Sequence, residues 1–244
     1  MKTVGIIPSR YGSSRFPGKP LADLCGKPMI VRVYERVANA RNLTDLIVAT
    51  YDERIMNICK KNGMNFILTS DKHKTAANRL AEVSQSVDAD FYVQINGDEP
   101  LIKTDAITAC IPDEIPQTYE FGTNIITEIT EPSNVIDVAN IKVTFDAEMN
   151  ALYMSRTPIP TPFGTLDFKY YKHVGIIGYN KKMLNFYAST KAGRFETIEG
   201  IDTLRFLDYG KKLRFVLVHD CKTLSVDTPK DLEVCRKFFL GEQR

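Results

Sequence analysis

Short apolar runs alternate with amphipathic runs through the first part of the chain. Four short runs are largely apolar, as expected of strands buried on both faces of a parallel sheet: residues 3–8, 45–50, 65–70 and 90–97. Longer runs with apolar residues at helical spacing lie between them: residues 27–40, 52–63 and 76–87. Three consecutive β-α-β units predict a doubly wound α/β fold with a mostly parallel sheet.

The pattern changes in the second half of the chain. Extended segments are predicted at residues 122–130, 140–147, 151–160 and 170–180. Helical patterns follow, with one late strand between the last two of them: helices at 181–189, 200–210 and 228–241, and the strand at 213–220. We expect a single domain over residues 1–244, in which a mixed-sheet extension at roughly residues 120–185 serves substrate binding or dimerisation.

Composition narrows the class of protein. Hydrophobic residues make up 43% of the 244 residues and charged residues 25%, which is typical of a globular protein with an ample core. The net charge of +2 implies no general affinity for nucleic acids or membranes. The five scattered cysteines include no CxxC pair, and the apolar run at the N-terminus is too short for a secretory leader. We therefore expect reduced thiols and a cytoplasmic location.

A basic loop follows the first predicted strand. The stretch "PSRYGSSRFPGKP", residues 8–20, contains Arg10, Arg15 and Lys19, with Gly12 and Gly18 as flexible points. In open α/β sheets the loop after the first strand is a preferred phosphate site. The loop has neither GxGxxG nor GxxxxGK[ST] spacing, which disfavours a dinucleotide site and a P-loop. Three cations suit a polyphosphate, although a solvated basic loop is the alternative.

Two acidic segments complete the predicted site. Asp98 and Glu99 follow a strand in "VQINGDEPLI", and Asp227 precedes the helix start at Pro229 in "LSVDTPKDLE". Mg²⁺ prefers one or two carboxylates and shares its remaining positions with water and phosphate oxygens. Taken singly, the acids are also explained by a surface turn and a helix N-cap. Together with the basic loop they indicate metal-assisted nucleotidyl transfer.

Segments spread over almost the whole chain resemble the bacterial 3-deoxy-manno-octulosonate cytidylyltransferases, the CMP-KDO synthetases. The segments, in order, are "IIPSRYGSSRFPGKPL", "GKPMI", "VAT", "NGDEP", "NIKVTFD", "ALYMSRTPIP", "KHVGIIGY", "LRFLDYG" and "VDTPKDLE". The resemblance implies that CTP reacts with a 3-deoxy-2-keto sugar acid, giving a CMP-sugar and pyrophosphate for lipopolysaccharide or capsule synthesis. It also implies a homodimer that requires Mg²⁺.

The resemblance also assigns roles to particular residues. Arg10, Lys19 and Asp98 would be catalytic, and Asp98 and Asp227 would bind Mg²⁺. The implied nucleotide-binding residues are Pro8, Ser9, Arg10, Ser14, Arg15, Lys19, Thr50, Asp52, Thr75, Arg79 and Asp98. The implied sugar-binding residues are Asn96, Arg156, His173, Asp202 and Thr203. A structural strand histidine is the alternative for His173, and bracing of a loop is the alternative for Arg156.

Several positions depart from the family pattern. The family sequence HxSGT[DE]R is "HKTAANR" here, at residues 73–79, and Tyr51 replaces an aspartate. Asp202 and Thr203 stand where the family has Glu-Gln, and Asn96 stands where it has Gln. The phosphate and metal positions are unchanged. We therefore hypothesise an active enzyme with an altered acceptor, such as an amino or otherwise modified 3-deoxy-ulosonic acid. An acylneuraminate-type transferase and a catalytically silent nucleotide-binding protein are the alternatives.

Overall fold

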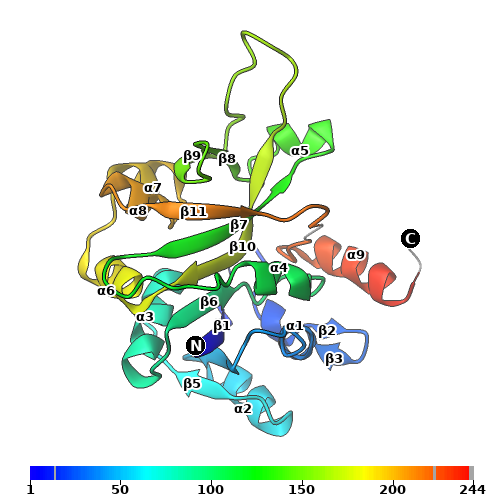
Figure 1. The fold of residues 1–244 in the computed structure, drawn as a ribbon. Coiled ribbons are helices and arrows are strands. Elements are labelled where there is room, and N and C mark those ends of the chain that lie inside the picture. The colour runs from blue at the N-terminus through cyan, green and yellow to red at the C-terminus, as the bar shows by residue number, and fades with distance from the viewer. Residues whose placement is uncertain (14, 222–223, 242–244) are drawn as a thin grey trace.

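The computed structural model describes residues 1–13, 15–221 and 224–241. Among these residues, nine strands form one sheet (Figure 1). Seven of them lie side by side in the order β11 (Leu213–Leu217), β7 (Gly122–Glu128), β10 (Tyr171–Tyr179), β6 (Phe91–Ile95), β1 (Thr3–Pro8), β4 (Asp45–Thr50) and β5 (Phe66–Leu68). The two others, β8 (Lys142–Phe145) and β9 (Ala151–Ser155), extend the sheet from β10.

The strand directions confirm the predicted doubly wound, mostly parallel sheet. β1 pairs in parallel with β4 and β6, β4 pairs in parallel with β5, and β11 pairs in parallel with β7. β10 is antiparallel to both of its long neighbours, β6 and β7. The chain passes from β1 to β4 and β5 on one side and then returns to β6 on the other. The loops after β1 and β6 therefore meet at a topological switch point, where α/β sheets bind ligands.

Helices cover both faces of the sheet. Successive strand residues point to opposite faces, so both faces carry apolar side chains that must be buried. Ile7 of β1 packs in one core cluster, whereas Val4 and Ile6 pack in the other. The first cluster includes residues of α1 (Met29–Val37), α2 (Glu53–Lys61), α4 (Thr104–Ala109) and α9 (Pro229–Phe239). The second includes residues of α3 (Ala76–Ser86), α6 (Lys181–Ser189) and α8 (Leu204–Asp208).

The helix predicted over residues 200–210 is shorter in the structure. A separate helix, α7 (Arg194–Glu199), ends at Gly200, which has a φ of 62° in the left-handed region. A turn follows, and α8 begins only at Leu204. Glycine tolerates this backbone conformation without steric cost, which allows α7 to end at this position.

Short elements fill the connections. They are η1 (Lys19–Leu21), β2 (Asp23–Leu24), β3 (Lys27–Pro28) and α5 (Pro132–Ile136). The connection between β9 and β10 projects from the sheet as a long loop at the top of Figure 1. All five cysteines are free thiols, as the sequence predicts. Among the described residues, no helix is both long and apolar enough to cross a membrane.

Candidate active site

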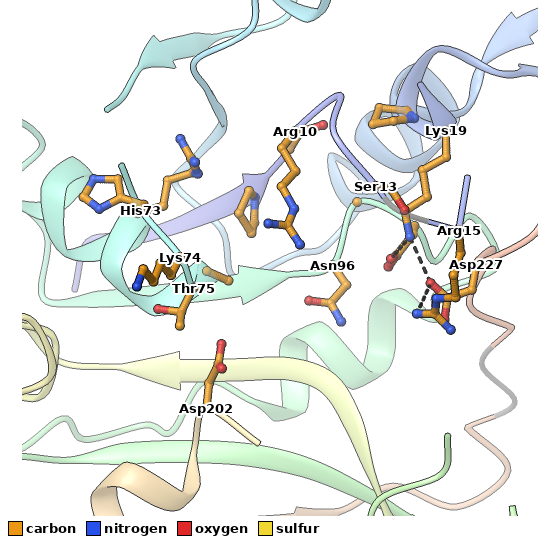
Figure 2. A pocket seen from close by; sticks show the side chains of 17 residues that line it. Arg10, Ser13, Arg15, Lys19, His73, Lys74, Thr75, Asn96, Asp202 and Asp227 are labelled. Carbon is orange, nitrogen blue, oxygen red and sulfur yellow. Dashed lines mark hydrogen bonds and ion pairs between the residues drawn. The ribbon is translucent and has the colours of Figure 1, made fainter. Parts of the chain in front are cut away.

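A pocket of about 440 Å³ opens at the switch point of the sheet (Figure 2). Its walls come from the loop after β1, the turn after β6 and the start of α3, together with one residue before α8 and one before α9. Eleven residues assigned to the site from the sequence line it: Pro8, Ser9, Arg10, Arg15, Lys19, Thr75, Arg79, Asn96, Asp98, Asp202 and Asp227. Segments far apart in the sequence thus meet in one cavity.

Backbone geometry shapes the basic loop. Gly18 has a φ of 75°, and its N–H donates to the carbonyl oxygen of Tyr11 at 2.9 Å, which closes the loop on itself. The ring of Tyr11 lies beneath the guanidinium of Arg54, with Cζ 3.3 Å from the ring centroid. A Cβ at position 18 would lie 3.0 Å from that ring, so glycine is needed for both the conformation and the contact. Lys19 follows directly and starts η1.

Lys19 joins the two predicted metal-binding carboxylates. Its ammonium lies 2.5 Å from Oδ2 of Asp98 and 3.1 Å from Oδ1 of Asp227. The guanidinium of Arg15 lies 3.0 Å from the same oxygen of Asp227 (Figure 2). The two acids therefore share one cation beside the basic loop, although 129 residues separate them in the sequence. Such an arrangement can also hold a divalent cation, whose charge replaces that of the ammonium.

Backbone and buried side-chain contacts hold these two acids in place. The N–H of Val226 donates to the carbonyl oxygen of Asp98 at 2.8 Å, and the hydroxyl of Ser225 donates to Oε1 of Glu99 at 3.3 Å. Glu99 is 3% exposed, not on the surface turn that the sequence suggests. Burial, together with the neighbouring charge of Asp98, raises the pKa of Glu99 to about 7. These two hydrogen bonds link the segment before α9 to the turn after β6, and so hold Asp227 close to Asp98.

The sequence left open a capping role for Asp227, and the structure assigns that role to the next residue. Thr228 is the N-cap of α9, and its hydroxyl accepts from the N–H of Asp231. The side chain of Asp231 accepts in turn from the N–H of Thr228 at 2.8 Å, which completes a capping box. Asp227 precedes the cap, so its carboxylate faces the pocket instead of the helix.

The altered segment at residues 73–79 forms the entry to α3. Thr75 is the N-cap of this helix and accepts from the N–H of Asn78 at 3.2 Å. His73 lies 2.5 Å from a carboxylate oxygen of Glu82. Arg79 is buried, donates to the hydroxyl of Thr69, and lies 5.3 Å from the ring centroid of Tyr51. The tyrosine that departs from the family pattern therefore contacts the arginine that the segment retains.

Asn96 enters the pocket because glycine lies opposite it on β10. A Cβ at Gly175 would lie 2.1 Å from Nδ2 of Asn96 and 2.9 Å from Oε1 of Glu99. The N–H of Asn96 donates to the carbonyl oxygen of Gly175 at 3.3 Å. The close approach of these two strands fixes the amide between the phosphate loop and Asp202, as Figure 2 shows.

Asp202 lines the opposite wall of the pocket. Its carboxylate points into the cavity toward Thr75 (Figure 2). Its side chain has no hydrogen bond or ion pair with any other described residue. Burial and the nearby Glu196 raise the pKa of Asp202 to about 6, against the opposing effect of Arg205 and Arg10. Arg205 itself pairs with Glu196, at 2.6 Å and 2.7 Å, behind the pocket wall.

Two residues assigned to the nucleotide lie outside the pocket lining. Thr50 is fully buried, and its hydroxyl accepts from the N–H of Asp52 at 3.1 Å. Asp52 is the N-cap of α2 and pairs with Arg54 at 2.7 Å. The bonds from Arg54 lower the pKa of Asp52. These contacts organise the start of α2, and Ser14, which was also assigned to the nucleotide, lies outside the described residues.

Three residues assigned to the sugar also lie outside the pocket lining. His173 makes a 2.8 Å hydrogen bond through Nδ1 to Oδ1 of Asn124, and burial lowers its pKa to about 4. Arg156 donates to the carbonyl oxygens of Glu199, Gly200 and Val138, which is the bracing alternative. Thr203 is 3% exposed, and its hydroxyl contacts the sulfur of Met154 at 3.1 Å.

Other pocket residues were not predicted as site residues. They are Ser13, Pro20, His73, Lys74, Ala76 and Gly97. Each lies within two residues of a predicted site residue in the sequence. They belong to the basic loop, to "HKTAANR" and to "NGDEP", so proximity to predicted residues within these segments is the available signal. Lys74 adds another cation to the pocket, which increases its preference for a polyanionic ligand.

The fold and the pocket together define a nucleotidyltransferase: a basic loop at the switch point faces two convergent carboxylates. A family model described as cytidylyltransferase matches residues 4–213. The chain therefore belongs to the cytidylyltransferase family, and the resemblance expected from the sequence is confirmed.

Relatives and solved structures agree with this assignment. The 8-amino-3,8-dideoxy-manno-octulosonate cytidylyltransferase of Shewanella piezotolerans is 38% identical over 239 residues, covering 96% of this chain and 97% of the relative. The enzyme of the same name from Shewanella sediminis is 39% identical, with the same coverage. The structure of a CMP:2-keto-3-deoxy-manno-octonic acid synthetase complexed with CTP superposes with a TM-score of 0.92, 34% identity and full coverage of both chains. An inositol-1-phosphate CTP transferase from T. maritima, at 13% identity, a TM-score of 0.65 and coverage of 97% and 96%, shares the fold.

Proposed function

We propose that this enzyme couples CTP to 8-amino-3,8-dideoxy-manno-octulosonate, the acceptor in the names of the Shewanella relatives. More broadly, the acceptor is a 3-deoxy-2-keto sugar acid and the product a CMP-sugar for lipopolysaccharide or capsule synthesis. The observation that carries the proposal is the convergence of Lys19 and Arg15 on Asp98 and Asp227, opposite the acceptor wall, the side of the pocket that Asp202 lines. The free thiols of the five cysteines support a cytoplasmic location, where thiols stay reduced.

The reaction forms one bond and breaks one bond at the α-phosphorus of CTP. The anomeric hydroxyl oxygen of the acceptor attacks this phosphorus, and the bond to the oxygen that bridges the α- and β-phosphates breaks. Pyrophosphate leaves with that electron pair, and the hydroxyl proton passes to solvent. Catalysis of such a transfer depends mainly on alignment and charge neutralisation.

The basic loop supplies that neutralisation. Arg10, Arg15 and Lys19 line the pocket within one short loop, so their positive charges surround the same volume. A guanidinium can bind two phosphate oxygens at once, whereas an ammonium acts as a point charge that moves between partners. Lys19 contacts both carboxylates, and it can exchange one of these contacts for a phosphate oxygen when the triphosphate enters.

Asp98 and Asp227 fit Mg²⁺ as ligands. Their oxygens converge on one cation, and the described part of the chain contains no group of three or more His, Cys, Asp or Glu side chains that could hold a metal. Two carboxylates suit a Mg²⁺ ion that completes its shell with water and phosphate oxygens. When bound, the ion would neutralise developing charge on the phosphates.

An acceptor screen tests the proposed function. Purified enzyme with CTP and Mg²⁺ is assayed for pyrophosphate release with the 8-amino acid, with the 8-hydroxy acid KDO and with an acylneuraminate. The 8-amino acid should give the highest kcat/KM. Equal or faster turnover of KDO would contradict the altered acceptor, and turnover of the acylneuraminate alone would favour the other transferase class. CTP binding measured by calorimetry, with no turnover of any acid, would identify a silent nucleotide-binding protein.

The extension supports the proposal of a homodimer. Apolar side chains lie exposed on it and on the adjacent α7, including Phe163 at 99%, Leu166 at 84% and Ile198 at 67% exposed. Exposed apolar surface of this kind is typical of protein interfaces. Sedimentation equilibrium should give twice the chain mass, and Phe163→Glu with Leu166→Glu should shift it toward the monomer. A monomer for the unsubstituted enzyme at micromolar concentration would overturn the proposal.

A further inference from the structure

We infer that Asp202 determines acceptor specificity by pairing its carboxylate with the ammonium group of the acceptor. This inference rests on the proposed function, since it requires an amino acceptor. Three carboxylates line the pocket: Asp98, Asp202 and Asp227. Lys19 pairs with two of them, Asp98 and Asp227. Among the described residues, Asp202 alone of the three has no cationic partner, although cations surround the rest of the cavity.

The backbone holds the carboxylate of Asp202 toward the cavity. Ile201 and Thr203, on either side of it, are each 3% exposed and pack into the protein. The carbonyl oxygen of Asp202 accepts from the N–H of Arg205 at 3.3 Å, which starts the turn into α8. With both neighbours buried, the side chain between them points into the pocket, as Figure 2 shows. A ligand group placed there meets a preoriented carboxylate.

The charges behind this wall are already balanced. Both carboxylate oxygens of Glu196 accept from Arg205, and Oε1 also accepts from the hydroxyl of Tyr187 at 3.2 Å. Two more donors of the same guanidinium bond to the carbonyl oxygens of Tyr187 and Thr190. Four of the five N–H donors of Arg205 are therefore committed within the wall, and none of these bonds goes to Asp202. The charge of Asp202 is directed at the ligand and not at the scaffold.

The ammonium and hydroxyl acceptors differ in what they offer this carboxylate. An ammonium provides both a hydrogen bond and a compensating charge in a half-buried site. A hydroxyl provides a hydrogen bond only and leaves the desolvated charge uncompensated. Sites built around a specific polar partner reject analogues that lack it more strongly than apolar pockets do. Asn96 lies between Asp202 and the phosphate-binding residues, so the amino end and the reacting end of one acceptor can occupy opposite sides of the pocket.

The test compares acceptor preference in Asp202→Asn with that of the unsubstituted enzyme. The readout is the ratio of kcat/KM for the 8-amino acid to kcat/KM for KDO. Asparagine has the same shape but no charge, so the ratio should fall about 100-fold, mainly through slower use of the amino acid. Asp202→Glu retains the charge and should recover part of the preference. Asp105→Asn, an exposed carboxylate on α4, is the control and should leave the ratio unchanged.

The outcomes separate this inference from the proposed function. If the unsubstituted enzyme does not prefer the amino acid, the proposed function fails. If the unsubstituted enzyme prefers the 8-amino acid and Asp202→Asn has the same ratio of kcat/KM values, only the proposed role of Asp202 fails. A raised KM for CTP, equal with both acceptors, would also overturn the inference, because it would place the nucleotide against this residue. Each variant is checked by thermal unfolding, and the ratio is insensitive to a partly unfolded fraction.

Discussion

The two sides of the pocket differ in how their charges are balanced. On the phosphate side, Asp98 and Asp227 are paired with Lys19 and Arg15. On the acceptor side, the carboxylate of Asp202 faces the cavity without such a partner among the described residues. The paired side provides what any nucleoside triphosphate requires, and its sequence matches the family. Asp202, which stands where the family has glutamate, belongs to the unpaired side, so the difference directs the tests of acceptor choice to this wall.

The largest expected effect is on the phosphate side. Lys19→Met should lower kcat/KM for CTP about 1,000-fold, because it removes a positive charge aimed at the transferring phosphates and leaves two carboxylates without their shared cation. Pyrophosphate release at saturating acceptor measures the change. Lys61→Met, at the exposed end of α2, is the matched control and should retain full activity. A loss of less than tenfold in Lys19→Met would remove this residue from the catalytic set.

The second effect is on the scaffold of the acceptor wall. Arg205→Met should lower the free energy of unfolding by about 3 kcal/mol, because it leaves the buried carboxylate of Glu196 without its counter-charge. Lys27→Met removes an exposed pair with Glu35 and should cost less than about 1 kcal/mol. Urea unfolding of the two variants measures the contrast. Equal destabilisation would show that the pair behind Asp202 contributes no more than a surface pair.

Much of the phosphate side could be predicted from the sequence, for a physical reason. Arg10, Arg15 and Lys19 lie within one short loop directly after a recognisable buried strand, and strand order places that loop at the ligand-binding edge. Asp98 follows another such strand. The position of a ligand-binding loop in a doubly wound sheet is therefore encoded locally, and the structure places all four residues in one pocket.

The acceptor side could be predicted only in part. His173 and Arg156 were assigned to the sugar, but their side chains are committed to Asn124 and to backbone carbonyl oxygens. Such commitments depend on contacts between distant segments, which no local pattern encodes. The same holds for Glu99, which follows a turn in the sequence yet is buried against Ser225. The predicted helix over 200–210 begins at Gly200, whereas in the structure this left-handed glycine ends α7, a helix that was not predicted.

A smaller effect is expected at Asn96, which lies between the phosphate side and the acceptor side of the pocket. Gly175→Ala should raise the KM for the acceptor about tenfold with little change in the KM for CTP, because the new Cβ displaces the amide of Asn96. Gly164→Ala, where the added Cβ meets no atom within 4 Å, is the control. Initial rates over a grid of both substrate concentrations give the two constants. Equal changes in both would show that Asn96 serves the nucleotide as much as the acceptor.

The smallest effect is a pH dependence of acceptor preference. Burial and the charge of Glu196 raise the pKa of Asp202. The charges of Arg205 and Arg10 oppose this rise, and the resulting pKa is about 6. Above pH 6 the carboxylate is charged and attracts an ammonium; below it the group is protonated and serves a hydroxyl equally well. The ratio of kcat/KM for the 8-amino acid to that for KDO should therefore be constant near pH 8. It should fall as pH decreases through 6, by up to about tenfold per unit.

Both acceptors share the phosphate side, so its titrations cancel in the ratio, and Asp202→Asn should give a flat profile. A profile that falls equally in this variant would assign the titration to another group and separate the charge of Asp202 from acceptor choice.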